Sequence, residues 1–185
     1  MLGVWIVVGA LVLAVVVGIL LYNRLITLRV RCENAWSQID VQLRRRYDLI
    51  PNLIETVKGY AAHEREVFEQ VTQARANAEA ASGPREQASA ENAVTESLRR
   101  LIAVAENYPQ LKANQNFLAL QEELTGTEDK IAYARQFYND QVQAYNARIQ
   151  SFPASLIVAM TGGRFTPREF FEIDEPARGP VGVQF

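Results

Sequence analysis

The chain has 185 residues, a formal net charge of -2 and a single cysteine. This length suits one domain beside a membrane or targeting segment, and the near-neutral charge gives no overall case for nucleic acid binding. One cysteine, Cys32, excludes an internal disulfide framework and fits a reducing compartment. The charges are unevenly spread, because residues 24–58 carry seven Lys or Arg against four Asp or Glu, whereas residues 64–129 carry six against twelve.

The first predicted element is a helix that spans a membrane. The run from Leu2 to Tyr22 contains no charged residue, and its twenty-one residues extend about 31 Å as a helix, the thickness of a hydrocarbon core. A cleaved signal peptide would have a basic start, a shorter apolar run and small residues at the cut site. We therefore expect residues 1–23 to be a retained single-pass anchor. Its interface anchors are Trp5, Tyr22 and Arg24.

The charges that flank this segment predict its orientation. Arg24, Arg29 and Arg31 follow the apolar run, and no acidic residue comes before Glu33. Under the positive-inside rule, this excess of arginine places residues 24–185 in the cytoplasm.

Four long helices are predicted after the anchor. This region has few glycines and no alternating apolar and polar run long enough for a strand. Proline is tolerated in the first turn of a helix and disrupts its interior, so each proline is expected to mark a helix start. The resulting helices cover residues 23–50, 51–82, 84–107 and 110–152, with a short piece after Pro153. The second and third helices begin at Pro51 and Pro84, and the fourth begins near Pro109.

Apolar residues recur every three or four positions along each of these segments, as on a helix that buries one face. The clearest case is a seven-residue repeat, which favours shallow packing between helices. It runs through Phe117, Leu124, Ile131, Tyr138, Tyr145 and Phe152.

The predicted fold class is therefore all-α. We expect the transmembrane helix to continue, without an intervening Gly or Pro, into an antiparallel four-helix bundle with long helices over residues 24–152. Residues 153–173 are expected to form a short helix and a Phe-rich segment packed on the bundle or at the membrane. Residues 174–185 are expected to form a flexible tail.

No catalytic or metal-binding motif is complete. His63 and Glu64 resemble the start of an H-E-x-x-H zinc motif, but the chain has no second histidine. Phosphate-binding loops and the G-x-S-x-G elbow are missing, and the acidic pairs Glu122–Glu123 and Glu128–Asp129 lack the Glu-x-x-His motifs of a di-iron bundle. Cys32 lies on an apolar stripe and is expected in the core. We expect no cofactor, no metal site and no enzymatic activity.

The triplet Arg44-Arg45-Arg46 allows three interpretations: a solvated helix face, a docking surface for an acidic partner, or a nucleic acid site. The last is disfavoured because stacking aromatics and a broad basic face are missing. A straight helix would place the triplet about 32 Å from the bilayer, which is beyond electrostatic reach of lipid headgroups. The candidate partner-docking surface comprises Arg44, Arg45, Arg46, Asp48, Asn52, Glu55 and Lys58.

Three long runs resemble the LemA family of bacterial membrane proteins: AWSQIDVQLRRRYDLIPNLIETVKGYAAHE, ENYPQLKANQNFLALQEELTGTEDKIAYARQFYNDQVQAYNARIQSFP and MTGGRFTPREFFE. The resemblance covers Tyr22 to Glu172, and only the tail departs from it. It implies a short N-terminal anchor, a helical bundle and a place in the bacterial plasma (inner) membrane. It implies no established catalytic residues. It also implies an association with organelle membrane biogenesis in magnetosomes, and with genes for membrane metalloproteases.

The functional hypothesis is a non-enzymatic, single-pass membrane scaffold or interaction module that organises the membrane or envelope. Its expected partners are membrane lipid, through the N-terminal helix, and other proteins or further copies of the chain, but not nucleic acid. An adaptor or accessory subunit of a membrane protease or envelope stress system is the alternative. An unidentified enzyme ranks third.

Overall fold

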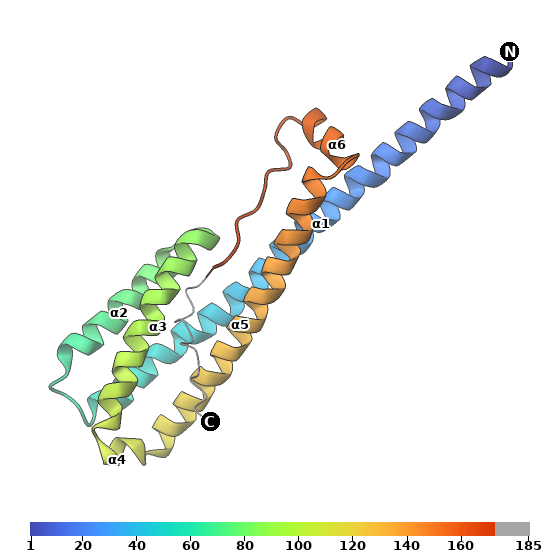
Figure 1. The fold of residues 1–185 in the computed structure, drawn as a ribbon. Helices are drawn as coiled ribbons and strands as arrows, with labels where there is room; N and C mark the ends of the chain where they lie inside the picture. Colours follow the sequence, from blue (N-terminus) through green and yellow to red (C-terminus); the bar gives the residue numbers. More distant parts are fainter. Residues whose placement is uncertain (173–185) are drawn as a thin grey trace, which may run out of the picture. The chain divides into compact units, whose positions relative to one another are not determined.

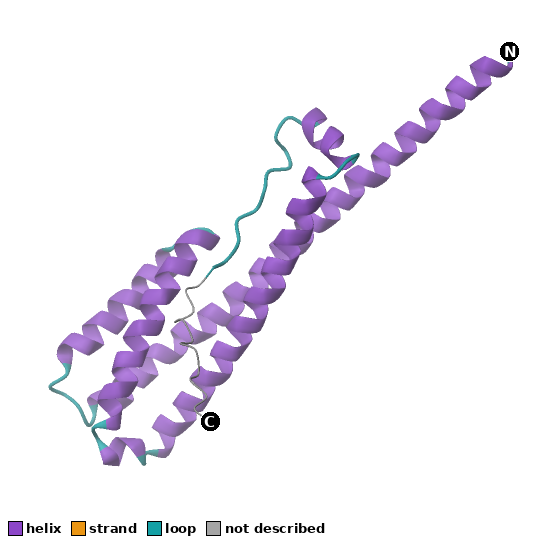
Figure 2. Cartoon of the chain, viewed as in Figure 1, coloured by secondary structure: helices purple, strands orange, loops and turns teal. Residues whose placement is uncertain are grey.

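The structure is a computed structural model that describes residues 1–172, and over this range it contains helices and loops without a strand (Figure 2). The predicted tail over 174–185 lies outside the described residues. The helices are α1 (Leu2–Lys58), α2 (Arg65–Ala80), α3 (Pro84–Glu106), α4 (Pro109–Lys112), α5 (Gln115–Gln150) and α6 (Ala154–Met160) (Figure 1). The all-α prediction is confirmed.

Helix α1 is continuous from the apolar N-terminal segment into the amphipathic sequence that follows, as predicted. It also passes through Pro51, so the prediction that a second helix begins at Pro51 is wrong. Proline removes one backbone hydrogen bond and disfavours a helix interior by about 3 kcal/mol. The flanking residues Ile50 and Leu53 are buried, and their packing continues the apolar stripe across the proline. The chain turns at residues 59–64 instead.

The later prolines behave as expected. Pro84 and Pro109 occupy the first turns of α3 and α4. The long helix predicted from residue 110 is interrupted, however, because α4 ends after one turn and α5 begins at Gln115. The side-chain oxygen of Asn114 accepts hydrogen bonds from the backbone N–H groups of Asn116 and Phe117, at 2.9 and 3.2 Å. This arrangement caps the exposed donors at the start of α5.

The described chain divides into two compact units. Within the described residues, the first comprises residues 1–40 and 133–169, and the second comprises residues 41–132 and 170–172. Helices α1 and α5 each contribute to both units.

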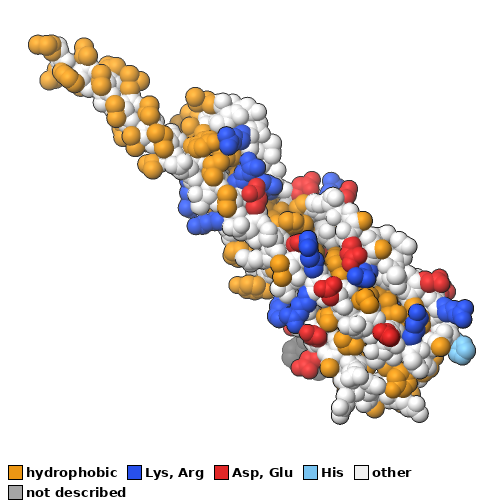
Figure 3. Space-filling view, turned by 180° about the vertical axis from the view of Figure 1, so that it is seen from behind, with side chains coloured by type: hydrophobic (Ala, Val, Ile, Leu, Met, Phe, Trp, Pro, Cys, Tyr) orange, Lys and Arg blue, Asp and Glu red, His pale blue; other side chains and the backbone are white. Residues whose placement is uncertain are grey.

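In the first unit, the N-terminal segment is covered by exposed apolar side chains (Figure 3). By length and composition, α1 is able to cross a membrane. Burial begins at Leu25, and the ring of Trp36 packs 5.3 Å from that of Tyr138. The core of this unit contains Leu25, Leu28, Cys32, Ala35, Ile39, Ala134, Tyr138, Val142, Tyr145, Ile149, Ala154 and Phe165.

The segment after α6 returns along the first unit. The Phe165 ring meets the edge of Tyr22 at 5.7 Å between centroids. Further on, Arg168 exchanges two backbone hydrogen bonds with the Asn146 side chain, both 2.9 Å, and its guanidinium lies 2.7 Å from Glu33. The phenol of Tyr138 donates to the Glu169 carbonyl at 2.9 Å. These polar contacts attach residues 165–169 to α1 and α5.

In the second unit, α2 and α3 lie side by side and run in opposite directions, joined by the short link of residues 81–83 (Figure 1). The end of α1 and the start of α5 contribute to the same core. Its apolar members include Leu43, Tyr47, Ile50, Leu53, Val57, Phe68, Val71, Val94, Leu98, Leu101, Phe117 and Leu124.

Candidate functional site

The three consecutive arginines on α1 have different environments. Arg44 and Arg45 are exposed, whereas Arg46 is only 1% exposed. Successive residues on a helix are about 100° apart, so the triplet cannot lie on one face. Arg46 is therefore neither on a solvated face nor on the predicted docking surface, because its side chain is occupied inside the second unit.

Arg46 lies at the centre of a buried ionic cluster. Its guanidinium is 2.9 Å from the Glu91 carboxylate on α3 and 2.7 Å from the Glu128 carboxylate on α5. It also donates to the Thr95 hydroxyl at 2.8 Å. A buried arginine requires hydrogen-bonded partners of opposite charge, and the two carboxylates supply them. The Nε atom of Arg46 has no hydrogen-bond partner among the described residues. The cluster joins α1, α3 and α5 at one point.

The Glu91 carboxylate also accepts hydrogen bonds from neutral donors. These are the Tyr47 phenol and the Gln87 amide, the latter at 3.1 Å. Burial, followed by the hydrogen bond to Glu91, raises the pKa of Tyr47 far above its usual value, so this phenol stays protonated. Burial also raises the pKa of Glu128, with Arg46 opposing and Glu91 adding to the shift. The arrangement is a structural network of ion pairs and one neutral phenol.

Sequence reasoning missed Glu91. The available signal was its phase, because Gln87 and Glu91 precede Val94 and Leu98 at intervals of four, three and four along the apolar stripe of α3. A glutamate in this position must be buried with a partner, and Arg46 is separated from it by 45 positions in sequence.

The remaining predicted docking residues lie on the surface of α1. Arg44, Asp48, Asn52 and Glu55 follow each other by three or four residues and are all exposed, and they therefore share one helix face. Beside this face, Arg45 forms a 2.8 Å ion pair with Glu123 on α5, with both side chains about half exposed. We call Arg44, Arg45, Asp48, Asn52, Glu55 and Lys58 the docking face.

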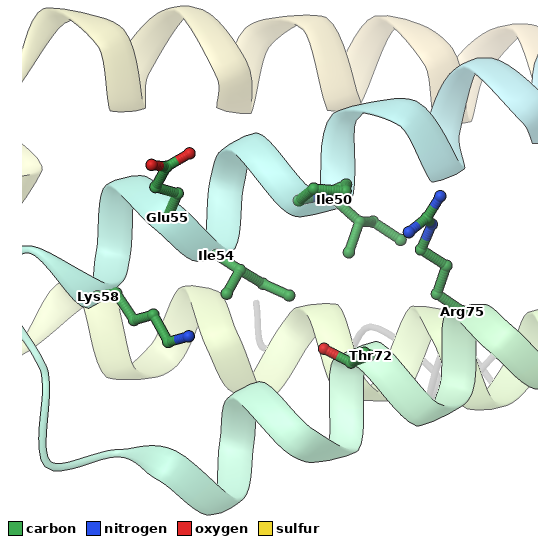
Figure 4. A pocket seen from close by; sticks show the side chains of 7 residues that line it. Ile50, Ile54, Glu55, Lys58, Thr72 and Arg75 are labelled. Carbon is green, nitrogen blue, oxygen red and sulfur yellow. The ribbon is translucent and has the colours of Figure 1, made fainter.

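One edge of the docking face opens into a groove between α1 and α2. The groove has a volume of about 420 Å³ and is lined by Ile50, Pro51, Ile54, Glu55, Lys58, Thr72 and Arg75. In Figure 4, Lys58 and Arg75 lie toward its two ends, with Ile54 and Ile50 between them. Arg75 is held by Glu79 on its own helix, at 2.9 Å. Since Glu55 also lines it, the groove combines an apolar floor with side chains of both charges.

The candidate chemical groups are not gathered into a reactive site. Cys32 is 2% exposed, and burial raises the pKa of its thiol, which disfavours the nucleophilic thiolate. His63 is exposed in the turn between α1 and α2. Across residues 1–172, no three His, Cys, Asp or Glu side chains are grouped so as to hold a metal ion.

The predicted interface residues occupy the two ends of the apolar segment. Trp5 is 73% exposed and Arg24 is also exposed. The Tyr22 ring is partly covered by Phe165 and by the guanidinium of Arg164, whose carbon lies 5.8 Å from the ring centroid. Arg164 and Tyr22 thus bring a cationic and an aromatic side chain together where the apolar run ends.

Comparison with known proteins places this architecture in a family. The model of the LemA family matches residues 35–185. The chain is similar to magnetosome proteins MamQ 1 and MamQ 2 of Paramagnetospirillum magneticum and to magnetosome protein MamQ of Magnetospirillum gryphiswaldense, with 25% identity over 182 residues in each case. Each match covers 84% of this chain and 66% of the relative, so the chain spans just under two thirds of the relatives' length. The protein belongs to the LemA family.

Proposed function

We propose that this protein is a non-enzymatic, single-pass membrane scaffold whose helices present a docking face to protein partners or to further copies of the chain. Residues 1–23 form the anchor, and residues 24–152 form an antiparallel four-helix bundle on the cytoplasmic side of the bacterial inner membrane. The magnetosome relatives support a role in membrane organisation, because they are named for a membrane organelle.

The observation that carries the proposal is the composition of α1 within the first unit. Large apolar side chains from Leu2 to Leu20 are exposed, most of them by more than 40%. Burial of such a side chain is worth about 1.5–3 kcal/mol, so the segment gains a large free energy when lipid surrounds it. The same helix buries Leu25, Leu28 and Cys32 immediately afterwards. One continuous helix thus connects the anchor to the packed part of the unit.

The ionic cluster supports the bundle arrangement and the scaffold role. Arg46 contacts α3 and α5 at once, while α2 packs on α3, so four helical segments share one core. The charges of this network are paired with one another, so it holds the three helices together without offering a reactive group. The docking face adds exposed polar side chains of both signs on α1, which suit a partner surface of mixed charge.

Membrane insertion is tested with the full chain in cell membranes. Alkaline carbonate should leave the protein in the membrane fraction, and a variant without residues 2–22 should be released. Protease added to spheroplasts should leave the chain after the anchor, from residue 24 onward, intact if it is cytoplasmic. Digestion from outside would overturn the orientation, and carbonate release of the full chain would overturn the anchor.

The scaffold role is tested by purification in mild detergent and native mass measurement. A discrete homo-oligomer, or a stable complex with a protein of the membrane-organising machinery, is the expected result. A membrane protease present in stoichiometric amount would overturn the scaffold role and favour the alternative function, that of an adaptor subunit for that protease. A monomer without partners in native membranes and after crosslinking would contradict both.

The docking face is tested by charge reversal at Arg44 and Arg45. The matched control reverses Arg99 and Arg100 on α3, two exposed arginines whose ion pairs with Glu96 lie within the same helix. We expect the first double variant to lose its crosslinked partners or its self-association, and the control to retain them. Equal crosslinking patterns in both variants and the wild type would remove the docking face from the proposal.

A further inference from the structure

We propose that α6 is a second membrane contact, which lies along the bilayer interface and inserts one apolar face into the leaflet from which α1 emerges. The inference rests on the proposed function, because it takes residues 2–22 as the membrane span. It adds a defined lipid-binding surface to the anchor.

The face in question is strongly exposed. Leu156 and Met160 are 55% and 83% exposed and are spaced by four residues, so they project from one side of α6. Phe152, just before the helix, is 78% exposed, whereas Ala154 in the first turn is fully buried. Phe152, Leu156 and Met160 thus recur at intervals of four residues and leave three large apolar side chains in solvent unless another surface covers them.

The location of α6 within the first unit identifies what covers this patch. The side chain of Ile157 comes within 4.0 Å of the Cβ position of Gly18, inside the apolar segment of α1 and one turn before Tyr22. This is an ordinary van der Waals distance, so α6 lies alongside the apolar segment of α1. The exposed face of α6 therefore lies next to the part of α1 that faces lipid, and the two together form one lipid-contacting surface.

The flanking charges fit a bilayer interface. From Gln150 to Gly163 the chain carries no charged residue. The first charged residues on either side of this stretch are Arg148 and Arg164, and Arg164 lies over the Tyr22 ring. Together with Arg24, they supply cations near the depth of the phosphate groups, while the apolar side chains reach the acyl chains.

The length of α6 excludes a second span and favours an interfacial position. Seven helical residues extend about 10 Å, a third of the hydrocarbon thickness. A protein partner could also cover the face, but a protein interface is surrounded by a polar rim, whereas the segment that carries this face is uncharged throughout. Lipid requires no such rim.

The test places an environment-sensitive NBD fluorophore on single cysteines in the full chain, in a C32A background. The positions are Leu156 on the apolar face and Gln136, an exposed residue of α5 in the same unit. The protein is reconstituted into vesicles of phosphatidylcholine and phosphatidylglycerol, with and without lipids that carry a spin label near the headgroup end of the acyl chain. We expect the Leu156 probe to shift to shorter wavelength and to lose most of its emission with spin-labelled lipid, and the Gln136 probe to do neither.

The outcomes separate this inference from the proposed function. If the protein stays in the vesicles after carbonate extraction but the Leu156 probe behaves like the Gln136 probe, α6 does not touch lipid and the inference fails alone. If the Leu156 probe shifts without quenching by spin-labelled lipid, a second copy or another protein covers the face, which also overturns the inference. Carbonate release of the wild type would instead remove the anchor.

A further variant tests the apolar face itself. F152S/M160S leaves α1 and its anchor intact and removes the two most exposed apolar side chains of this face. We expect the quenching of the Leu156 probe to fall to the level of the Gln136 probe in this background. Undiminished quenching would show that insertion does not depend on the proposed face.

Discussion

The Arg46 guanidinium and the Glu91 carboxylate lie 2.9 Å apart with side-chain exposures of 2% and 0%. Removing one member of a buried ion pair leaves an uncompensated charge, whereas replacing both with apolar groups of similar size is much less damaging. This pair therefore has a clear mutational signature.

We expect R46M to lower the free energy of unfolding by about 3–5 kcal/mol. The double variant R46M/E91L should be considerably more stable than R46M, because the fully buried carboxylate is removed and only the partly exposed Glu128 carboxylate is left beside the new methionine. The control R45A removes the half-exposed pair with Glu123 and should cost roughly 0–1 kcal/mol. Chemical unfolding in detergent, followed by circular dichroism, measures all three. Equal losses for R46M and R45A would contradict the buried cluster.

The phenol of Tyr138 predicts an alkaline loss of stability. Burial raises its pKa to about 12, whereas a tyrosine in the unfolded chain has a pKa of about 10. Between these values the folded state holds a proton that the unfolded state has lost, so stability falls as the pH rises from about 10 to about 12. The unfolding midpoint measured across this range should fall less steeply in Y138F than in wild type.

The same substitution removes the hydrogen bond to the Glu169 carbonyl and should cost about 1 kcal/mol at neutral pH. Y133F is the matched control, since Tyr133 is 74% exposed, and it should leave the neutral stability unchanged. A Y138F profile parallel to that of wild type would show that Tyr138 ionises normally. Part of the slope should remain in Y138F, because burial also raises the pKa of Tyr47.

Two glycines with open space around them give opposite predictions. Gly83 has φ +83°, a conformation that other residues adopt only with strain, so G83A should destabilise by about 1–3 kcal/mol. Gly126 lies inside α5, and a methyl group added to it would meet nothing within 4 Å, so G126A should stabilise by about 0.5–1 kcal/mol. Thermal unfolding of the two variants distinguishes them by sign. A stabilising G83A would mean that the link before α3 adopts another conformation.

Pro51 lies inside a continuous helix and lacks the N–H that would bond to the Tyr47 carbonyl. P51A restores that donor and should raise the free energy of unfolding by about 1–3 kcal/mol. The control P84A, at the first turn of α3, should gain nothing, because its missing N–H is not needed there. The two unfolding midpoints, compared with that of wild type, measure the difference. A destabilised P51A would indicate that the chain breaks at residue 51 after all.

The amino-acid sequence by itself determined the local elements. The uncharged run from Leu2 to Tyr22, the start of α3 at Pro84 and the seven-residue apolar repeat of α5 follow from hydrophobicity, backbone restriction and helical periodicity, all of which act over a few residues. The exposure of Arg44 and Arg45 was also identifiable, because charged residues in a helical pattern are exposed by default.

Only the tertiary structure decided which residues depart from what these local patterns predict. Arg46 is buried although Arg45 beside it is exposed, and this depends on Glu91, which is 45 positions away in sequence. Pro51 lies inside a helix because the packing of its flanking residues outweighs its local preference. The proposal that the exposed face of α6 contacts lipid depends on the contact between Ile157 and Gly18, which lie far apart in the sequence. Such contacts are set by the free energy of packing between helices, which no short stretch of sequence contains.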